Sequence, residues 1–208
     1  MVNLFGSGRE MKILIACECS GRVRDAFIKK GHDAVSCDIL PTELPGPHIQ
    51  GDVLEALNNG WDMMIGHPPC TFLSYAGTRC WNRPGRLNNR LKALEFFAKL
   101  WQAPIDKICL ENPKGCASPT IAKYSQSIQP YFFGDPASKE TWLWLKNLPH
   151  LKHYRLPDLF GEQTHVDKGG YVTYSNGEST PAWYANCKRG DRSKTFQAIA
   201  DAMAEQWR

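Results

Sequence analysis

The sequence lacks long apolar runs, which limits where the protein can function. No stretch of about 18 consecutive apolar residues occurs, so a membrane-spanning helix is excluded. The run at 11–16 (MKILIA) is too short for a signal peptide, and charged residues follow it at once. We therefore expect a cytoplasmic protein. We also expect residues 1–10 (MVNLFGSGRE) to be an expression leader, with Met11 as the natural start.

Paired cysteine motifs, internal repeats and low-complexity tracts are also missing. The eight cysteines are scattered, at positions 17, 19, 37, 70, 80, 109, 116 and 187, and none forms a CxxC pair. A zinc site is therefore not expected, and reduced thiols are the better interpretation. The formal net charge is only +4, which is compatible with a nucleic-acid partner without identifying one.

Strand-like and helix-like segments alternate along most of the chain. Strands are predicted at 12–17, 32–37, 49–53, 61–65, 105–110, 130–133 and 141–145, and helices at 21–30, 87–101, 119–127 and 193–207. This order is typical of a doubly wound α/β sheet. Residues 11–146 form the predicted core, and residues 192–208 form a helix that completes it. Residues 147–191, rich in Pro, Gly, Asn and Ser, are expected to be a short, loop-rich appendage.

A cysteine stands where one predicted strand ends. The run Gly66-His67-Pro68-Pro69-Cys70 follows the apolar stretch 63–65, so Cys70 lies on a stiff turn at a strand's carboxyl end. This position suits a nucleophile in a crevice. Forty-one positions later, Glu111 follows a second apolar strand. Free cysteines are most often buried and structural, but the pairing with Glu111 favours a nucleophile.

The first turn of the predicted sheet carries candidate ligand-binding residues. Ser20 and Gly21 open a helix whose free N–H groups favour a polar or anionic group. Asp38 ends the second strand and can accept both hydroxyls of a ribose, while Asp52 can accept from an adenine amine. Glu18 would repel a pyrophosphate but can hold a cationic amine. Because the GxGxxG fingerprint is absent, an ordinary turn with solvated aspartates remains an alternative.

These pieces, taken in order, resemble the DNA (cytosine-5) methyltransferase family, especially small phage-encoded members. GHPPCTFLS at 66–74 is similar to the family's GGPPCQxFS, and 111–113 (ENP) is similar to its ENV. Residues 136–141 match the family's PQxRxR loosely, and 192–195 (RSKT) match its last motif. The resemblance implies a Rossmann-like methyltransferase sheet.

The resemblance also implies an activity and a set of site residues. Cys70 would add to C6 of cytosine in DNA, so that C5 can accept the methyl group of S-adenosyl-L-methionine. Glu111 would bridge N3 and the exocyclic amine. The residues expected to bind the cofactor are Glu18, Ser20, Gly21, Asp38, Asp52 and Pro68. A positive neighbour is needed to favour the Cys70 thiolate, and His67, Arg79 and Arg83 are the candidates.

The chain departs from the family in its substrate-binding parts. Lys139 and Thr141 stand in place of the two arginines of PQxRxR, and only about 45 residues (147–191) are available to recognise a target. Arg79 and Arg83 follow the nucleophile and can contact a phosphate backbone. Two other functions stay open: modification of a single-stranded or free pyrimidine nucleotide, and non-catalytic binding of nucleic acid or S-adenosylmethionine.

Overall fold

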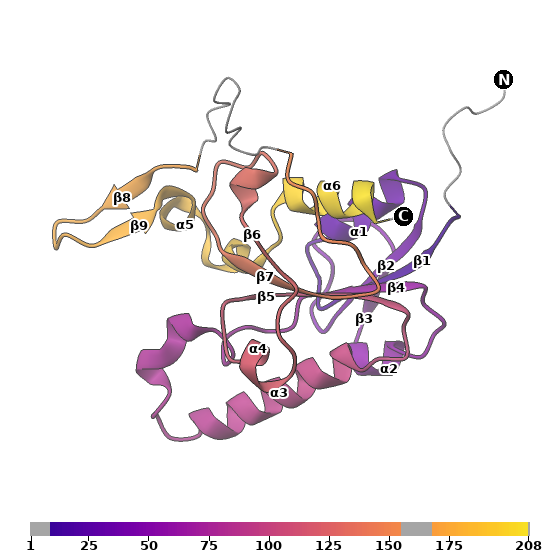
Figure 1. Cartoon of the computed structure of the whole chain (residues 1–208), viewed down its shortest axis with the longest axis horizontal. Helices are drawn as coiled ribbons and strands as arrows, with labels where there is room; N and C mark the ends of the chain where they lie inside the picture. Colours follow the sequence, from indigo (N-terminus) through magenta and orange to yellow (C-terminus); the bar gives the residue numbers. More distant parts are fainter. Residues whose placement is uncertain (1–8, 155–167, 208) are drawn as a thin grey trace.

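The computed structural model describes residues 9–154 and 168–207 and is organised around a seven-stranded sheet (Figure 1). The strand order is β3-β2-β1-β4-β5-β7-β6. The strands are β1 (Lys12–Ala16), β2 (Asp33–Asp38), β3 (His48–Gln50), β4 (Met63–Gly66), β5 (Lys107–Pro113), β6 (Gln126–Ile128) and β7 (Thr141–Lys146). Strands β1 to β5 pair in parallel, and β7 runs antiparallel between β5 and β6. The doubly wound sheet predicted from the sequence is thereby confirmed.

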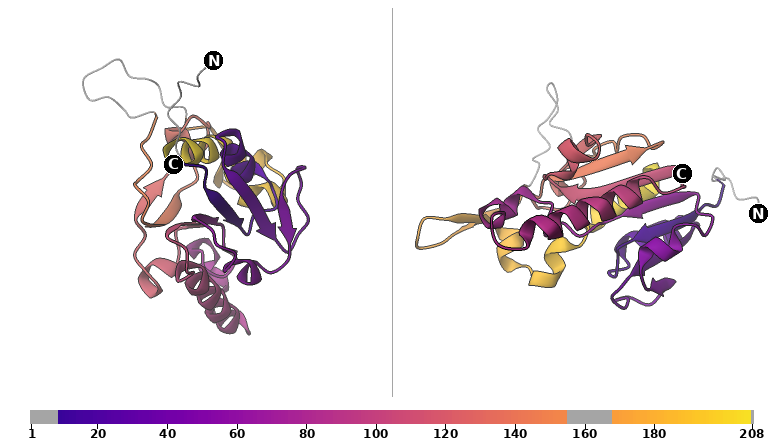
Figure 2. Two further views of the ribbon diagram at one scale, coloured as in Figure 1. Left: turned by 90° about the vertical axis from the view of Figure 1, so that its right-hand side faces the viewer. Right: turned by 90° about the horizontal axis from the view of Figure 1, so that it is seen from below.

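Helices cover both faces of this sheet. They are α1 (Arg22–Lys29), α2 (Val53–Ala56), α3 (Arg86–Trp101), α4 (Ala117–Thr120) and α6 (Gln197–Gln206), with 3-10 turns η1 (Tyr75–Cys80) and η2 (Pro130–Phe132). Helices α1 and α6 lie on one face, and α2, α3 and α4 lie on the other (Figures 1 and 2). No helix in the described part of the chain is long and apolar enough to cross a membrane.

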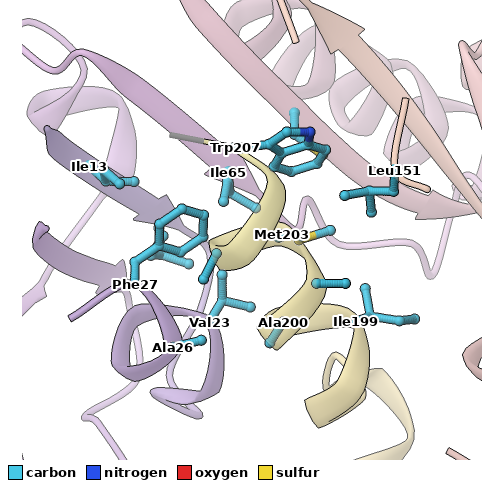
Figure 3. Packing of buried hydrophobic residues seen from close by; sticks show 14 of the residues in the cluster. Ile13, Val23, Ala26, Phe27, Ile65, Leu151, Ile199, Ala200, Met203 and Trp207 are labelled. Atoms are coloured by element: carbon cyan, nitrogen blue, oxygen red, sulfur yellow. The ribbon is translucent and has the colours of Figure 1, made fainter. Parts of the chain in front are cut away.

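The central strands are apolar without interruption because both of their faces are covered. Ile13, Leu14 and Ile15 of β1 are fully buried, and successive side chains join different clusters. One cluster packs α1 and α6 against the sheet, with Phe27 and Trp207 among its members (Figure 3). The closing helix is therefore part of the core, although it is separated from α1 by most of the sequence.

The order of the strands creates the crevice of the fold. Strand β1 pairs with β2 on one side and with β4 on the other, so the crossover direction reverses at β1 and β4. In open α/β sheets, ligands bind outside the carboxyl ends of the strands at this point. The turns that begin at Cys17 and at His67 both leave the sheet there.

Two local predictions are wrong at the sheet's edge. The segment 119–127 is not one helix: α4 ends at Thr120, and Gln126 begins the edge strand β6. Pairing with β7 outweighs the local helix preference, because each edge residue gains backbone hydrogen bonds to a strand already in place. The segment 130–133 is a 3-10 turn rather than a strand, since Pro130 has no N–H to donate to a ladder.

Only the second half of helix α3 packs into the core. Leu94, Phe97 and Leu100 are buried, but Leu87 and Leu91 are exposed. The first turns of α3 instead make cation–π contacts with the segment after Cys70, with Arg86 over Phe72 at 4.5 Å and Arg90 over Trp81 at 3.8 Å. Arginines in the first turns of α3 therefore hold the loop that follows Cys70.

The appendage contains more regular structure than predicted. Within its described part lie the hairpin of β8 (Tyr171–Thr173) and β9 (Ser179–Pro181), the helix α5 (Ala182–Asn186) and the 3-10 turn η3 (Arg189–Ser193). The hairpin projects from the body of the molecule (Figure 1). Residues 155–167, residues 1–8 of the expected leader and residue 208 lie outside the described residues.

Candidate active site

One cavity brings together the predicted nucleophile and most of the predicted cofactor-binding residues. It has a volume of about 670 Å³ and lies at the carboxyl ends of β1, β2 and β4. Five of the predicted residues line it: Glu18, Ser20, Asp38, Asp52 and Cys70. The candidate nucleophile and the candidate cofactor-binding carboxylates thus share one space. Gly21, Pro68 and Glu111 are not among the lining residues.

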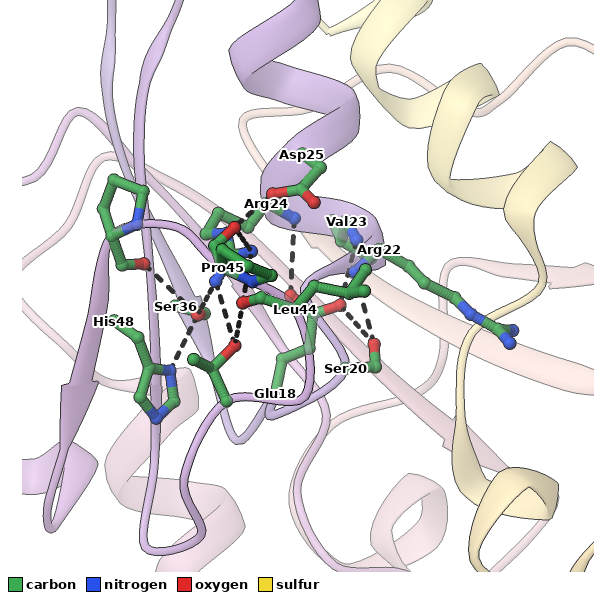
Figure 4. Close-up of polar contacts among 12 residues, drawn as sticks. Glu18, Ser20, Arg22, Val23, Arg24, Asp25, Ser36, Leu44, Pro45 and His48 are labelled. Carbon is green, nitrogen blue, oxygen red and sulfur yellow. Dashed lines mark hydrogen bonds and ion pairs between the residues drawn. The ribbon is translucent and has the colours of Figure 1, made fainter.

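The turn after β1 uses its carboxylate differently from the prediction. Glu18 Oε1 accepts hydrogen bonds from the Ser20 hydroxyl at 2.8 Å and from the Val23 backbone N–H at 2.9 Å (Figure 4). Its Oε2 accepts from the Arg24 N–H at 3.3 Å. Glu18 therefore caps α1, and these N–H groups are not free for a ligand. Gly21 is required by the turn itself, because its φ is +76° and a Cβ would lie 2.6 Å from Arg24.

The loop that follows Asp38 is anchored from beneath by a buried arginine. The fully buried Arg24 guanidinium pairs with Asp25 at 2.7 Å and donates to the carbonyls of Leu44 and Pro45 at 3.2 and 3.1 Å (Figure 4). A buried charge needs such partners to be tolerated. The loop that forms the β2 side of the cavity is thereby held in one conformation.

Within the described part of the chain, Asp38 and Asp52 each use only one carboxylate oxygen in a hydrogen bond. Asp38 Oδ1 accepts from the Leu40 N–H at 2.9 Å, and Asp52 Oδ1 accepts from the Leu54 N–H at 3.0 Å as the cap of α2. Oδ2 of each takes no hydrogen bond from the residues that the structure describes. Two carboxylates on the cavity wall are thus oriented by the backbone and still able to accept from a ligand.

The loop that carries Cys70 is fastened at both ends. The His67 N–H donates to the Ala16 carbonyl at 2.9 Å, and the Asn112 amide donates to the Pro68 carbonyl at 2.7 Å. The Cys70 carbonyl in turn accepts from two N–H groups that follow it in a tight turn. Asn112 of the ENP run thus positions the Cys70 loop, and Pro68 takes part through its backbone carbonyl.

The loops after β4 and β5 are joined to each other. The Cys116 N–H donates to the Leu73 carbonyl at 2.9 Å, and the Tyr75 N–H donates to the Lys114 carbonyl at 3.1 Å. Gly115 lies at their closest approach, where a Cβ would come within 2.2 Å of the Leu73 oxygen. Only glycine fits there, so the distance between the two loops depends on this residue.

Glu111 lies in a buried polar cluster. The parallel register pairs Gly66 with Leu110, which places His67 beside Glu111. The His67 Nδ1 lies 3.1 Å from Glu111 Oε2, and the Thr195 hydroxyl donates to the same oxygen at 2.8 Å. Burial alone would raise the pKa of Glu111, but His67, the charge of Lys139 and the Thr195 hydrogen bond lower it to about 2.

Cys70 is half-buried, and its surroundings act on it in opposite directions. Burial raises the pKa of the Cys70 thiol, and the Glu111 charge raises it further, while the Lys139 charge and a backbone hydrogen bond lower it. The cation that favours the thiolate is therefore Lys139 rather than the three candidates offered by the sequence.

The predicted substrate-binding residues fall into two groups. Lys139 acts electrostatically on both Cys70 and Glu111, so it belongs to the site. Thr141 is buried in β7, and its hydroxyl donates to the Lys139 carbonyl at 3.3 Å, so it supports the lysine's segment. Arg79 and Arg83 are exposed on and after η1 and do not line the cavity.

The segment before α6 contributes residues that sequence reasoning did not assign. Ser193, Lys194 and Thr195 line the cavity, and Lys194 pairs with Glu43 of the loop after β2. The polar run 192–195 directly before an apolar helix is the signal that points to them. His67 stands where the similar motif GGPPCQxFS has glycine, and this difference is the sequence signal that points to it.

The described residues contain no metal-binding cluster, and the cysteines form no disulfide. Among residues 9–154 and 168–207, no group of three His, Cys, Asp or Glu side chains is placed to hold a metal ion. The eight cysteines are free thiols.

No protein-family model and no curated protein matches the sequence. Among solved structures, the chain is similar to a candidate DNA modification methyltransferase encoded within an E. coli prophage, with 13% identity and a TM-score of 0.44 over 65% of this chain and 46% of that chain. It is also similar to the Dnmt2 methyltransferase of S. pombe, with 15% identity and a TM-score of 0.49 over 76% of this chain and 57% of that one.

The chain thus spans about half the length of these two proteins. The Rossmann-like methyltransferase fold expected from the sequence is confirmed by the sheet order and by the antiparallel β7. The function is inferred below from the geometry of the chain's own site.

Proposed function

We propose that this protein is a methyltransferase that uses S-adenosylmethionine and modifies C5 of cytosine in DNA through a covalent bond from Cys70 to C6. The observation that carries the proposal is the single cavity lined by Cys70 and by the Asp38 and Asp52 carboxylates. Glu111, on the strand next to that of Cys70, supplies the carboxylate that a bound pyrimidine needs.

The lining of the cavity fits the cofactor. Asp38 has a free oxygen for ribose hydroxyls and Asp52 has one for an adenine amine, as described above. Ile39, Leu40 and Phe96 add an apolar wall suited to a purine. Glu18 adds a buried negative charge that favours a cationic amine. When bound, S-adenosylmethionine supplies an electrophilic methyl group.

Cys70 and Glu111 act on different atoms of the base. C5 of cytosine is a poor nucleophile, and addition of the Cys70 thiolate at C6 makes it enamine-like. Glu111 contacts N3 and the exocyclic amine, where charge develops during the addition. Lys139, whose charge lowers the pKa of both Cys70 and Glu111, favours the thiolate during this addition.

A DNA substrate requires a surface around Cys70 that can accept a flipped base and contact the backbone phosphates. C5 and C6 cannot be reached within a stacked duplex, so the target base must be flipped out. The exposed Arg79 and Arg83 follow the nucleophile's loop and are free to contact backbone phosphates on either side of such a base.

The decisive experiment is incubation with tritiated S-adenosylmethionine and, separately, DNA, RNA or dCMP. Label in DNA at C5 of cytosine, lost in Cys70→Ser, supports the proposal. Label found only in RNA or dCMP would indicate that the substrate is a single-stranded nucleic acid or a free nucleotide. Absence of label in all three, with S-adenosylmethionine bound, favours a non-catalytic binding protein.

A further inference from the structure

His67 is the residue of the site that the proposed mechanism leaves without a role. Its side chain is 12% exposed and lines the cavity. Nδ1 lies 3.1 Å from Glu111 Oε2 and 3.3 Å from the Thr195 hydroxyl. Nε2 is buried and has no hydrogen-bond partner among the residues that the structure describes. A buried ring with one nitrogen on a carboxylate needs an explanation beyond packing.

The charges around His67 favour its protonated form. Glu111 of β5 and Glu18 of the turn after β1 act on it as anions, and Lys139 of the segment before β7 acts as a cation. Burial lowers the pKa of His67, but Glu111 and Glu18 more than offset this, and the pKa is raised overall. Since the pKa of Glu111 is lowered to about 2, the proton of the pair resides on the imidazole.

This arrangement bears on a step that Glu111 cannot complete by itself. When a thiolate bonds to C6, the π pair of C5=C6 moves to C4–C5 and the π pair of C4=N3 moves onto N3. N3 must then take a proton, or it carries a negative charge in a buried site. As a carboxylate, Glu111 has no proton to give.

We propose that His67 supplies this proton through Glu111. This rests on the proposed function of the site. The proton leaves Nδ1 of the imidazolium for the Glu111 carboxylate, and the carboxylic acid protonates N3 as the Cys70 sulfur bonds to C6. The imidazole becomes neutral, and the base gains one proton and one thiolate. The proton returns by the same path when the sulfur leaves.

Thr195 provides the control for a merely structural role. Its hydroxyl holds the same Glu111 oxygen at 2.8 Å but cannot supply a proton at neutral pH. If the imidazole served only to orient Glu111, then removing either neighbour would have the same consequence. The two residues therefore separate orientation from proton supply.

The first measurement needs no substrate. In an NMR titration, the imidazole signal that disappears in His67→Asn should report a midpoint above the ordinary histidine range. In Glu111→Gln that midpoint should fall, because the anion that holds the proton is gone. An unchanged midpoint in Glu111→Gln would overturn the proposal.

The second measurement follows the addition step alone. DNA containing 5-tritiated cytosine releases tritium when a thiolate adds to C6, because C5 then exchanges its hydrogen with water. The wild type should show a bell-shaped rate against pH: the rate rises as Cys70 ionises and falls as His67 loses its proton. His67→Asn keeps a donor toward Glu111 but cannot supply a proton, so its rate should be lower by on the order of 100-fold near neutral pH and should rise continuously with pH.

The remaining outcomes separate this inference from the proposed function. Thr195→Val should release tritium more slowly but keep the alkaline fall, since His67 is retained. If His67→Asn keeps the alkaline fall, His67 is not the proton source, although cytosine chemistry stands. If the wild type releases no tritium from any DNA, both the proposed function and this inference are wrong.

Discussion

The Thr195 hydroxyl donates a 2.8 Å hydrogen bond to Oε2 of Glu111, which lies eighty-four positions earlier in the chain. This contact brings the segment before α6 into the site, and α6 itself is packed into the core. The Glu111 carboxylate is therefore held by a residue close to the C-terminal helix as well as by His67 of the neighbouring loop.

Replacing Cys70 by serine should abolish methyl transfer while leaving the fold and cofactor binding near wild type. A hydroxyl is a far weaker nucleophile than a thiolate at neutral pH. Labelling from tritiated S-adenosylmethionine measures transfer, and DNA containing 5-fluorocytosine should trap a covalent complex with the wild type only. Cys80→Ser, at a half-buried cysteine beyond the loop, should behave as wild type. Undiminished methylation by Cys70→Ser would falsify the nucleophile assignment.

Replacing Asp38 by alanine should weaken binding of S-adenosylmethionine. The loss of a pair of charge-assisted hydrogen bonds costs on the order of 1.5–3 kcal/mol, which is roughly 10- to 100-fold in affinity. Calorimetry provides the measurement. Asp33→Ala, at the other end of the same strand and exposed, should bind normally. Wild-type affinity in Asp38→Ala would remove the ribose assignment, and binding of NADH in place of S-adenosylmethionine would remove the proposed function.

Glu111 should make stability depend on pH in the acid range. Its pKa is lowered in the folded protein from an ordinary value of 4.5 to about 2. Its contribution is thus fully present above about pH 4.5 and is lost as the pH falls toward 2, by about 3 kcal/mol in all. Urea unfolding of wild type and Glu111→Gln should therefore differ progressively less between pH 5 and pH 2. The exposed Glu55→Gln should follow the wild type, and a constant difference for Glu111→Gln would contradict the assignment.

Replacing Gly115 by alanine should damage catalysis through the backbone. The new Cβ would meet the Leu73 carbonyl oxygen at 2.2 Å, so the loops after β4 and β5 must separate. Strain of this kind costs about 1–3 kcal/mol, visible in thermal unfolding. Methyl transfer should fall while most of the affinity for S-adenosylmethionine is retained, because Asp38 and Asp52 lie on other loops. Gly170→Ala, with nothing within 4 Å of the added atom, is the matched control. Full activity in Gly115→Ala would show that the loop spacing does not matter.

Replacing both Arg79 and Arg83 by alanine should weaken DNA binding in a salt-dependent way. Each lost phosphate contact should reduce the slope of log affinity against log salt concentration by about 1. Titrations at several salt concentrations give this slope. A double variant of Lys29 and Lys152, which are exposed residues away from the Cys70 loop, should keep the wild-type slope. An unchanged slope in the arginine variant would place the DNA elsewhere.

The sequence by itself determined the sheet through β5 and the positions of Cys70 and Glu111. Buried parallel strands are continuous apolar runs, so strands such as β1 and β4 can be found from their residues alone. The chemistry-bearing residues follow those runs directly, and parallel strands deliver their ends to one edge of the sheet. The edge strand β6 was missed because its pairing partner, rather than its own residues, determines its conformation.

Only the tertiary structure decided which residues of the site interact with one another. Glu18 reads as a ligand-binding carboxylate in the sequence, yet the fold turns it onto the N–H groups of α1. Lys139 becomes the cation whose charge acts on Cys70, and Thr195 contacts Glu111, because the fold brings together residues that are far apart in the sequence. The pKa of a buried group depends on which groups surround it in space. Around Glu111 these are His67 after β4, Lys139 before β7 and the Thr195 hydroxyl before α6.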